Sequence, residues 1–325
     1  MPVLGLLLLL AMGASLAMGA VEIAPAEVAG VLLDRLGLGL TEVPSERAIA
    51  VVWGLRVPRI LLGLLVGGTL GATGVALQGM LRNEMADPHL LGIGPGAAIG
   101  AALGASVGGV QGGIAGGVAT GVLTALVVRR LGRSARLDRS KLILGGVALG
   151  ATLSAWTGFV VFGSDRSVVP PLEFWLLGSL SGATWRSLGT TLFFLAIGVG
   201  GLLIAARTLD LIALGEQQAW EVGVDVDMAS TVVLMLIGTA VGATVGAVGV
   251  VVFVGLLIPR LIRPLVGPLH RHLILAAMVG GGGFLVGSDL VARLLLEPVE
   301  IPVGLVTSVF GGPMFLWLAT RQHRG

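Results

Sequence analysis

The chain has 325 residues, of which 55% are hydrophobic and only 12% charged, and this balance excludes an ordinary water-soluble domain. It has no cysteine, which excludes disulfides, thiolate metal sites and thiol catalysis. The formal net charge of +2 comes with no basic surface interleaved with aromatic residues, so a nucleic-acid partner is not expected.

The apolar stretches predict an all-α, polytopic membrane protein with about ten transmembrane helices, because about 20 apolar residues span the hydrocarbon core. The 54 glycines favour close helix packing in lipid. We treat residues 1–325 as one transmembrane domain. The expected spans are 3–20, 60–80, 91–107, 114–128, 142–162, 188–206, 231–247, 250–265, 273–296 and 303–319.

The first apolar stretch is interpreted as a retained helix. Small residues follow its apolar run, as in a cleaved signal peptide, but no Lys or Arg precedes it and its removal would upset the charge pattern of the other spans. The following loop, residues 21–55, lies outside the membrane and contains a short amphipathic pattern that predicts a surface helix.

Alternation of the spans places most of the basic residues on one side, which the positive-inside bias assigns to the cytoplasm. Both termini then face the cytoplasm, and the chain is a multi-pass protein of the cell inner (plasma) membrane. The residues on that side are Arg82, Arg129, Arg130, Arg133, Arg136, Arg139, Lys141, Arg207, Arg263, Arg271, Arg321 and Arg324.

The segment 207–229 is too acidic to cross a bilayer and predicts a cytoplasmic docking surface. Asp210 can cap a short helix that Gly215 ends, and residues 216–222 can form a second helix closed by Gly223. The only lysine, Lys141, lies in no phosphate-binding loop, so we expect nucleotide energy to come from another subunit.

Two arginines stand at the outer end of the second span, against the general charge bias. Pro58 is expected in the first turn of that helix, between Arg56 and Arg59. A third outer arginine, Arg293, ends the ninth span. These residues suggest an acidic counterpart, although headgroup contact or, for Arg293, a structural role at a helix C-terminus would also explain them.

Asp289 is the one carboxylate well inside an expected span. It could belong to a transport pathway, but we favour a partner that holds Arg293 in place, because buried ions are usually paired.

Several strings, in this order, resemble one family, the membrane permease subunits of ATP-binding cassette (ABC) importers for iron–siderophores, haem and cobalamin. The resemblance covers about residues 52–321. Its strings are RVPR, GATGVALQGMLRN, ADPHLLGIGPGAAIGAALG, FWLLGSLSGATW, LIALGEQQAWEVGV, VGVVVFVGLLIPRLIRPLVGP and GSDLVARLLLEPVEIPVGLVTSVFGGPMFLWLATR.

This resemblance implies a bundle like that of the cobalamin importer permease, working as a dimer, most simply a homodimer. It implies two cytoplasmic ATPase subunits and a soluble substrate-binding protein outside. The chain itself would be no enzyme and would carry no cofactor, because ATP and Mg²⁺ would bind to the partner ATPase. One sequence does not tell which of the three substrates is carried, nor whether the second permease copy is identical.

The resemblance also assigns roles by motif position. Arg56, Arg59 and Arg293 look like the arginines that meet acidic residues of the binding protein. The segment from Leu211 to Gly223 looks like the coupling helices seated on the ATPase, with Leu211, Leu214, Gly215, Glu216, Ala219 and Gly223 as its contact positions. Asn83, Met85 and Ser140 resemble positions of the cytoplasmic gate.

Two positions depart from the family pattern. Glu84 stands where the family commonly has proline, which adds a charge to the gate loop. Arg260 follows Pro259 where histidine is usual, which strengthens the inner positive belt.

Two other functional classes explain the sequence less well than an importer permease. A secondary transporter or channel not coupled to ATP would explain the spans and a weak internal repeat between GGTLGATG and GTAVGATVG, but not the cytoplasmic docking segment. An intramembrane enzyme lacks a constellation of nucleophile, base and metal. The four histidines have no metal-binding spacing, so no metal site is expected.

Overall fold

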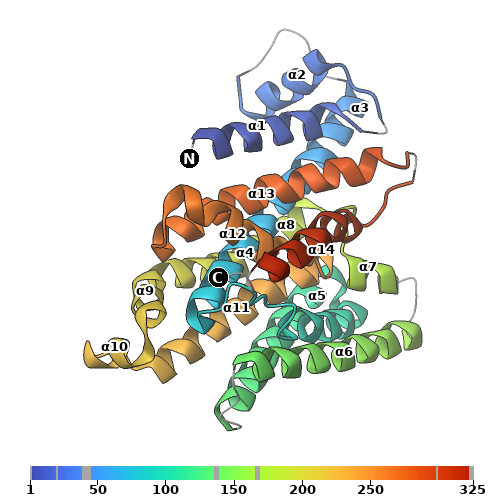
Figure 1. Ribbon diagram of the computed structural model, residues 1–325. Coiled ribbons are helices and arrows are strands. Elements are labelled where there is room, and N and C mark those ends of the chain that lie inside the picture. The colour runs from blue at the N-terminus through green and yellow to red at the C-terminus, as the bar shows by residue number, and fades with distance from the viewer. Residues whose placement is uncertain are drawn as a thin grey trace.

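The computed structural model describes residues 2–19, 21–38, 45–134, 139–164, 169–297 and 299–321, and within these ranges the chain is helical, with no strand. Its elements in order are α1 (Pro2–Ala17), α2 (Pro25–Arg35), α3 (Glu46–Ile49), the π-helix η1 (Ala50–Arg56), α4 (Val57–Leu81), α5 (Ile93–Ser134), α6 (Arg139–Gly163), α7 (Leu172–Leu177), α8 (Trp185–Ile204), α9 (Ala206–Leu214), α10 (Glu216–Glu221), α11 (Val226–Val248), α12 (Val254–Val266), α13 (His270–Leu294) and α14 (Val303–Arg321) (Figure 1).

Each of the ten expected spans coincides with helix, but not every one forms a full-length crossing. Among the described residues, six helical stretches are long and apolar enough to cross a membrane. One of them, α5, contains two of the expected spans. The helices at the expected spans 3–20 and 250–265 are too short for a full crossing. At the expected span 303–319, only the apolar part of the helix is too short.

Helix α5 reverses direction at two glycines. Gly108 and Gly109 leave helical geometry, and the positive φ of 56° at Gly109 is a conformation that glycine adopts without strain. Beyond the turn the two halves of α5 pack closely against each other. A Cβ on Gly104 would lie only 2.0 Å from the carbonyl oxygen of Gly112. The sequence pattern therefore separated these two spans correctly.

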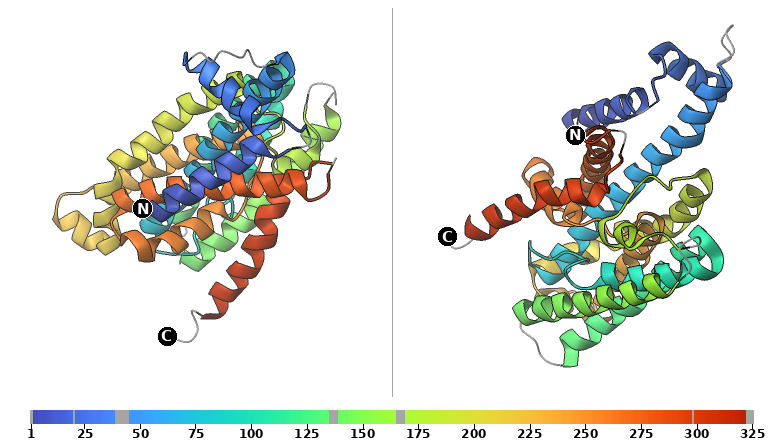
Figure 2. Two further views of the ribbon diagram at one scale, coloured as in Figure 1. Left: turned by 90° about the horizontal axis from the view of Figure 1, so that it is seen from above. Right: turned by 90° about the vertical axis from the view of Figure 1, so that its right-hand side faces the viewer.

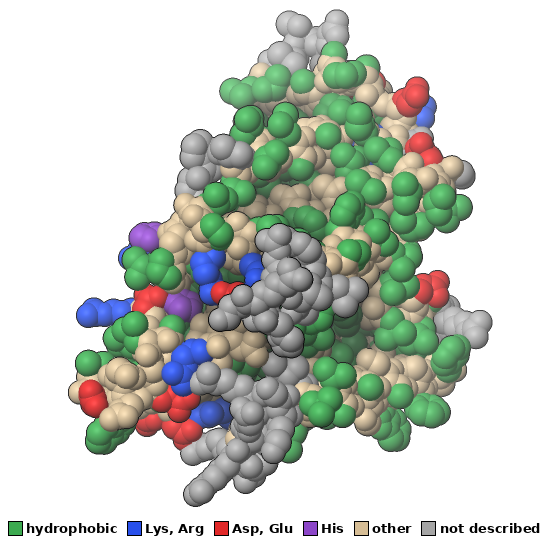
Figure 3. All heavy atoms as spheres, viewed as in Figure 1, with side chains coloured by type: hydrophobic (Ala, Val, Ile, Leu, Met, Phe, Trp, Pro, Cys, Tyr) green, Lys and Arg blue, Asp and Glu red, His purple; other side chains and the backbone are tan. Residues whose placement is uncertain are grey.

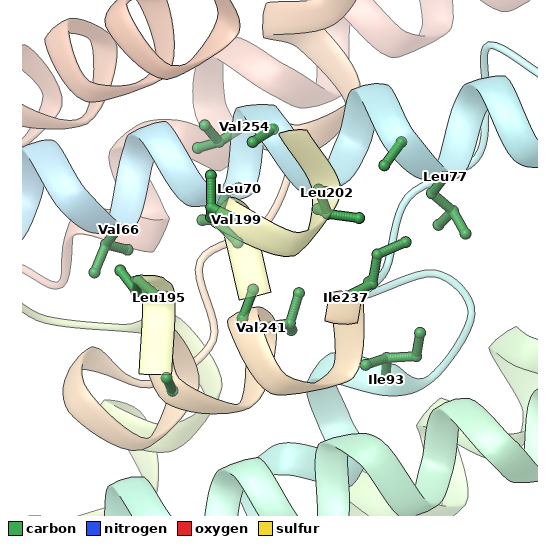
Figure 4. Close-up of a cluster of buried hydrophobic side chains, with 14 of the residues drawn as sticks. Val66, Leu70, Leu77, Ile93, Leu195, Val199, Leu202, Ile237, Val241 and Val254 are labelled. Carbon is green, nitrogen blue, oxygen red and sulfur yellow. The ribbon is translucent and has the colours of Figure 1, made fainter. Parts of the chain in front are cut away.

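Helix α4 runs through the centre of the bundle and packs against α8, α11, α12 and α13. Its apolar side chains Val66, Leu70 and Leu77 face residues of α8, α11 and the start of α12 (Figure 4). Glycine permits this approach, since a Cβ on Gly67 would lie 2.2 Å from the carbonyl oxygen of Gly281 in α13.

A second glycine contact fixes the start of α12 against α4. A Cβ on Gly74 would lie 1.9 Å from the carbonyl oxygen of Gly255, so no larger residue fits between the two backbones. The expected span 250–265 is shorter than predicted, because α12 begins only at Val254, after Phe253 in the left-handed region (φ 70°). The residues before it, 249–252, cross the interior as non-helical chain.

The N-terminal part of the chain covers one side of the bundle. Helix α1 packs along α13, and the segment after it carries α2 and α3, which pack together around Val31, Ala48 and Val52 (Figures 1 and 2). The surface helix expected between residues 21 and 55 is thus confirmed as α2. Helices α5 and α6 form the opposite side of the molecule (Figure 2).

The start of α4 differs from the expectation. Pro58 does lie in the first turn, but the helix continues upstream as η1, in which the N–H of Val57 donates to the carbonyl of Val52, five residues earlier. Because Pro58 has no N–H, the carbonyl of Trp53 is left free in this register. It accepts a hydrogen bond from Nε1 of Trp185 at 2.9 Å, which ties the end of η1 to the start of α8.

Candidate functional site

Charged side chains gather at one end of the bundle, around α9, α10 and the adjoining ends of α4, α12 and α13 (Figure 3). We call this end the coupling end. The opposite end carries the C-terminus of α1, η1 and the C-terminus of α13, and we call it the far end.

The coupling end carries the two short helices that the sequence predicted. Gly215 separates α9 from α10 with a φ of 149°, and its N–H donates to the carbonyl of Ile212 at 3.2 Å. Gly223 closes α10 with a φ of 86°, and the N–H of Val224 donates back to Ala219 at 3.0 Å. Both glycines occupy conformations that a side chain would strain.

The coupling helices present apolar side chains outward. Leu214 and Trp220 are each 73% exposed, and Val222 is exposed beside them. Ala219 is buried against the bundle, and Leu211 is half-buried. Of the predicted contact residues, Leu214, Glu216 and Gly223 therefore face outward, whereas Gly215 and Ala219 shape the segment from within.

Asp210 does not cap α9, and that expectation was wrong. It lies inside the helix, whose cap position is Ala205, and its Oδ1 accepts from the backbone N–H of His270 at 2.9 Å. The same oxygen lies 2.7 Å from Nδ1 of the His270 ring. Asp210 therefore caps α13, a contact between segments 60 residues apart that local sequence does not reveal.

The predicted gate loop begins where α4 ends. Arg82 terminates the helix in the left-handed region (φ 47°), and the N–H of Asn83 donates back to the carbonyl of Gln78 at 3.1 Å. Oδ1 of Asn83 then accepts from the N–H of Met85 at 2.9 Å, which holds the loop in a tight turn. Ser140 lies in the first turn of α6, and its side chain is outside the described part of the structure.

Three ion pairs tie this loop to its neighbours. Oε2 of Glu84 lies 3.2 Å from Nη1 of Arg260, and Oε1 lies 3.1 Å from Nη1 of Arg263. Nη2 of Arg82 lies 3.4 Å from Oε1 of Glu216, at the start of α10. The gate loop therefore contacts both α12 and the coupling helices.

Two buried polar residues in the same loop were not singled out as a site. Oδ1 of Asp87 accepts from the N–H of His89 at 2.8 Å, and burial lowers the pKa of His89 below its ordinary value, partly opposed by the charge of Asp87. The His89 ring packs on Gly94, where a Cβ would lie 1.9 Å from Nδ1. Among the described residues, no group of three metal-ligating side chains is present.

At the far end, Arg59 joins two carboxylates. It makes a bidentate interaction with Asp289, whose Oδ1 lies 2.9 Å from Nη2, and its Nη1 lies 2.9 Å from Oε2 of Glu300. Nε of Arg293 lies 3.3 Å from Oδ2 of Asp289. Asp289 is thus the partner of Arg293 that the sequence suggested, but its stronger contact is with Arg59.

The other two far-end arginines turn toward α1. Arg56 donates to the backbone carbonyls of Leu16, Ala17 and Val21, and is 5% exposed. Arg293 is 8% exposed and donates to Oγ of Ser15 at 2.5 Å and to the carbonyl of Met18 at 3.3 Å. Together they satisfy carbonyls at the C-terminus of α1, where positive charge is favourable.

The three predicted docking arginines therefore lie in one cluster with two acids, Asp289 and Glu300. The cluster of five side chains carries one net positive charge. A hollow of about 270 Å³ beside them is lined by all three arginines, Glu300 and Ser181. The structure thus brings the three arginines together around one hollow.

The model of the FecCD transport family matches residues 7–321, nearly the whole chain. The chain belongs to the FecCD transport family.

Members of the FecCD family with similar sequences are membrane permeases. The chain is 34% identical over 282 residues to the hemin transport system permease protein of Yersinia pestis, covering 84% of each chain. It is 37% identical over 276 residues to the cobalamin import system permease protein of Halobacterium salinarum, covering 84% of this chain and 74% of that one.

A solved structure has the same fold over the whole length. An inward-facing conformation of a metal-chelate type ABC transporter superposes with a TM-score of 0.80 at 30% sequence identity, covering 98% of this chain and 97% of that chain. The resemblance stated from the motifs is confirmed, and this FecCD protein is an integral membrane permease of an ABC importer.

Proposed function

We propose that this permease imports an iron chelate, haem or cobalamin, which a soluble binding protein delivers outside and which a separate ATPase drives across the inner membrane. The relatives named above carry hemin and cobalamin, and the similar structure is of metal-chelate type. These are large ring-shaped or chelated ligands, and they define the substrate class.

The exposed apolar side chains of α9 and α10 are the main support for this proposal. A membrane protein that leaves Leu214, Trp220 and Val222 in water outside its apolar helices gains by covering them with another protein. The ATPase, with its bound ATP and Mg²⁺, is the proposed cover. Its closure would push on the coupling helices, and only contacts that differ between its two states would drive transport.

The contact from Arg82 to Glu216 gives this push a route into the membrane part. It joins α10 directly to the end of α4, the central helix of the bundle. The gate residues Asn83 and Met85 follow Arg82 immediately, and Ser140 is assigned to the same gate. A second permease copy, most simply an identical chain, would supply the other half of the pathway.

The far end is the proposed docking face for the binding protein. An acidic side chain of that protein could enter the hollow beside Arg56, Arg59 and Arg293, whose net positive charge favours it. In this arrangement both chain termini and the coupling end face the cytoplasm, as the positive-inside bias requires.

Site-specific crosslinking tests the proposal, because the natural chain has no cysteine to confuse it. The variant Trp220→Cys, co-expressed with the ATPase subunit, labelled with a benzophenone maleimide and irradiated, is expected to crosslink to that subunit. The matched control Leu36→Cys is 71% exposed but lies on α2's side of the molecule, and it is expected to give no ATPase crosslink. Equal crosslinking from both positions, or none from Trp220→Cys, would contradict the proposal.

A further inference from the structure

A groove between α8 and α13 combines a basic pocket with a long apolar channel. At the coupling end, a hollow of about 710 Å³ is lined by Arg207, Arg271, His272 and Asp210, with apolar residues on its membrane side. Leu203 lines both this hollow and a second hollow of about 380 Å³, so the two adjoin each other. We call the two together the α8–α13 groove.

The charges of the basic pocket suit a phosphate group. Arg207 and Arg271 are exposed, and neither has an acidic partner among the residues that the structure describes. The one acid in the pocket, Asp210, is held by His270. The 25-residue helix α13 begins at the same pocket, but Asp210 already caps its N-terminus, so the two arginines are the groups left to meet a phosphate.

The second hollow is apolar apart from Thr69. Its floor is α4 at Leu65 and Gly68, and its walls are one face of α8, one face of α13 and Leu8 of α1. On α8 the lining runs from Leu203 through Gly200 and Ala196 to Leu192, which is about 16 Å of helix. That length matches one leaflet of the hydrocarbon core, about 15 Å.

The walls on α8 and α13 run from charged to apolar in the same direction. On α13 the sequence of lining residues is Arg271, Leu275 and then Val279, at helical spacing, and on the other wall it is Arg207, Leu203 and Ala196. An amphiphile with an anionic head and an apolar tail fits this order. Basic pockets between transmembrane helices at the membrane surface are sites of this kind for lipid headgroups.

We propose that the α8–α13 groove binds one anionic phospholipid, with its phosphate against Arg207 and Arg271 and one acyl chain along α8. This lipid would connect α8 and α13 next to α9, the first coupling helix. The inference depends on the membrane position of the chain, and it holds whatever substrate the permease carries.

The experiment measures lipid retention by the purified full-length chain. Delipidated protein is incubated with phosphatidylglycerol or with phosphatidylcholine of the same acyl chains, and bound lipid is counted by native mass spectrometry. We expect one phosphatidylglycerol per chain to be retained in clear preference to phosphatidylcholine. Equal retention of the two lipids would overturn the assignment of the basic pocket.

Charge variants test the head of the site. Each of Arg207→Gln and Arg271→Gln is expected to weaken phosphatidylglycerol binding about fivefold, and the double variant about 20-fold. The control Arg130→Gln removes an exposed arginine of α5 outside the groove and is expected to have no effect. If the double variant retains as much lipid as the control, the site is wrong.

A space-filling variant tests the tail. A Cβ on Gly200 would meet no atom within 4 Å, so the side chain of Gly200→Phe starts without a clash at the wall of the groove, and we expect it to reduce lipid retention. Gly189→Phe, on the same helix with equal free space but outside the groove, is the matched control. Unchanged retention in Gly200→Phe, or displacement of the lipid by free glycerol 3-phosphate at equal concentration, would overturn the acyl-chain assignment.

Discussion

The carboxylate of Glu84 lies 3.2 Å from the guanidinium of Arg260, which joins the loop after α4 to α12. The negative charge in this loop is thus compensated by an arginine of α12. Arg263, one turn further on α12, shares the same carboxylate. The pair holds the loop after α4 against α12.

Removing this pair should loosen the gate loop measurably. We expect a double-mutant cycle with Glu84→Gln and Arg260→Gln to show a coupling of about 0.5–1 kcal/mol, because both side chains are partly exposed and such pairs are weak. The measurement is the melting temperature of the four proteins in detergent at low salt. Strict additivity of the two single changes would show that the pair has no energetic role.

The contact of α4 with α13 should not tolerate even one methyl group. Gly67→Ala would place a Cβ 2.2 Å from a backbone carbonyl of α13, and overpacking of this kind destabilises by about 1–3 kcal/mol. We expect a clear fall in melting temperature and lower yield in the membrane. Gly189→Ala, which meets no atom within 4 Å, serves as the control and should melt like the natural protein.

Glu216 should be required for coupling but not for membrane insertion. It is exposed at the start of α10, and Glu216→Arg would reverse the charge that faces both the proposed ATPase and Arg82. We expect ATP-driven uptake to be lost while the amount of protein in the membrane is unchanged.

A charge swap separates the two contacts of Glu216. Because Glu216 also faces the proposed ATPase, and the swap does not restore that contact, we expect Arg82→Glu combined with Glu216→Arg to leave uptake abolished. Recovery of uptake in the double variant would show instead that the intrachain pair is the essential one. Normal uptake in Glu216→Arg alone would remove Glu216 from the coupling surface.

Buried His89 should make the fold sensitive to mild acid. Its pKa is lowered in the folded chain, chiefly by burial, below the ordinary value near 6.5. Below pH 6.5 the unfolded chain therefore binds a proton that the folded chain does not, so stability falls as pH falls, by at most about 1.4 kcal/mol per pH unit from this group.

The comparison uses a variant that cannot titrate. We expect the difference in melting temperature between pH 7.5 and 5.5 to be smaller in His89→Leu than in the natural protein. Asp87, the charged neighbour of His89, remains in both proteins, so the comparison isolates the imidazole. An identical pH dependence in the two proteins would mean that the pKa of His89 is the same in the folded and unfolded chains, which contradicts the account.

Local sequence predicted most of the helices because apolar runs and glycine breaks act over a few residues. The reversal at Gly108 and Gly109, the hinge at Gly215 and the end of α10 at Gly223 all follow from residues that accept positive φ or break a helix. The late start of α12 could not be predicted, because the apolar residues before it fit a membrane helix as well as a buried non-helical segment.

The partners of the charged residues were harder to predict, since they depend on contacts between distant segments. Arg59 and Asp289 are 230 residues apart, and Arg56 donates to carbonyls that no sequence pattern marks. The motif placed the three far-end arginines in one group, and they do lie close together in the structure. The hydrogen bonds of Arg56 and Arg293 to carbonyls at the end of α1 are seen only in the structure.

Uptake in vesicles tests most directly whether this permease depends on a separate motor. The purified chain is reconstituted in liposomes with and without its ATPase subunit, and radiolabelled haemin, cobalamin or ferric siderophore is presented with the binding protein, with ATP on the side of α10. We predict accumulation against a gradient only when the ATPase and ATP are both present. Uphill accumulation by the chain alone would contradict the account.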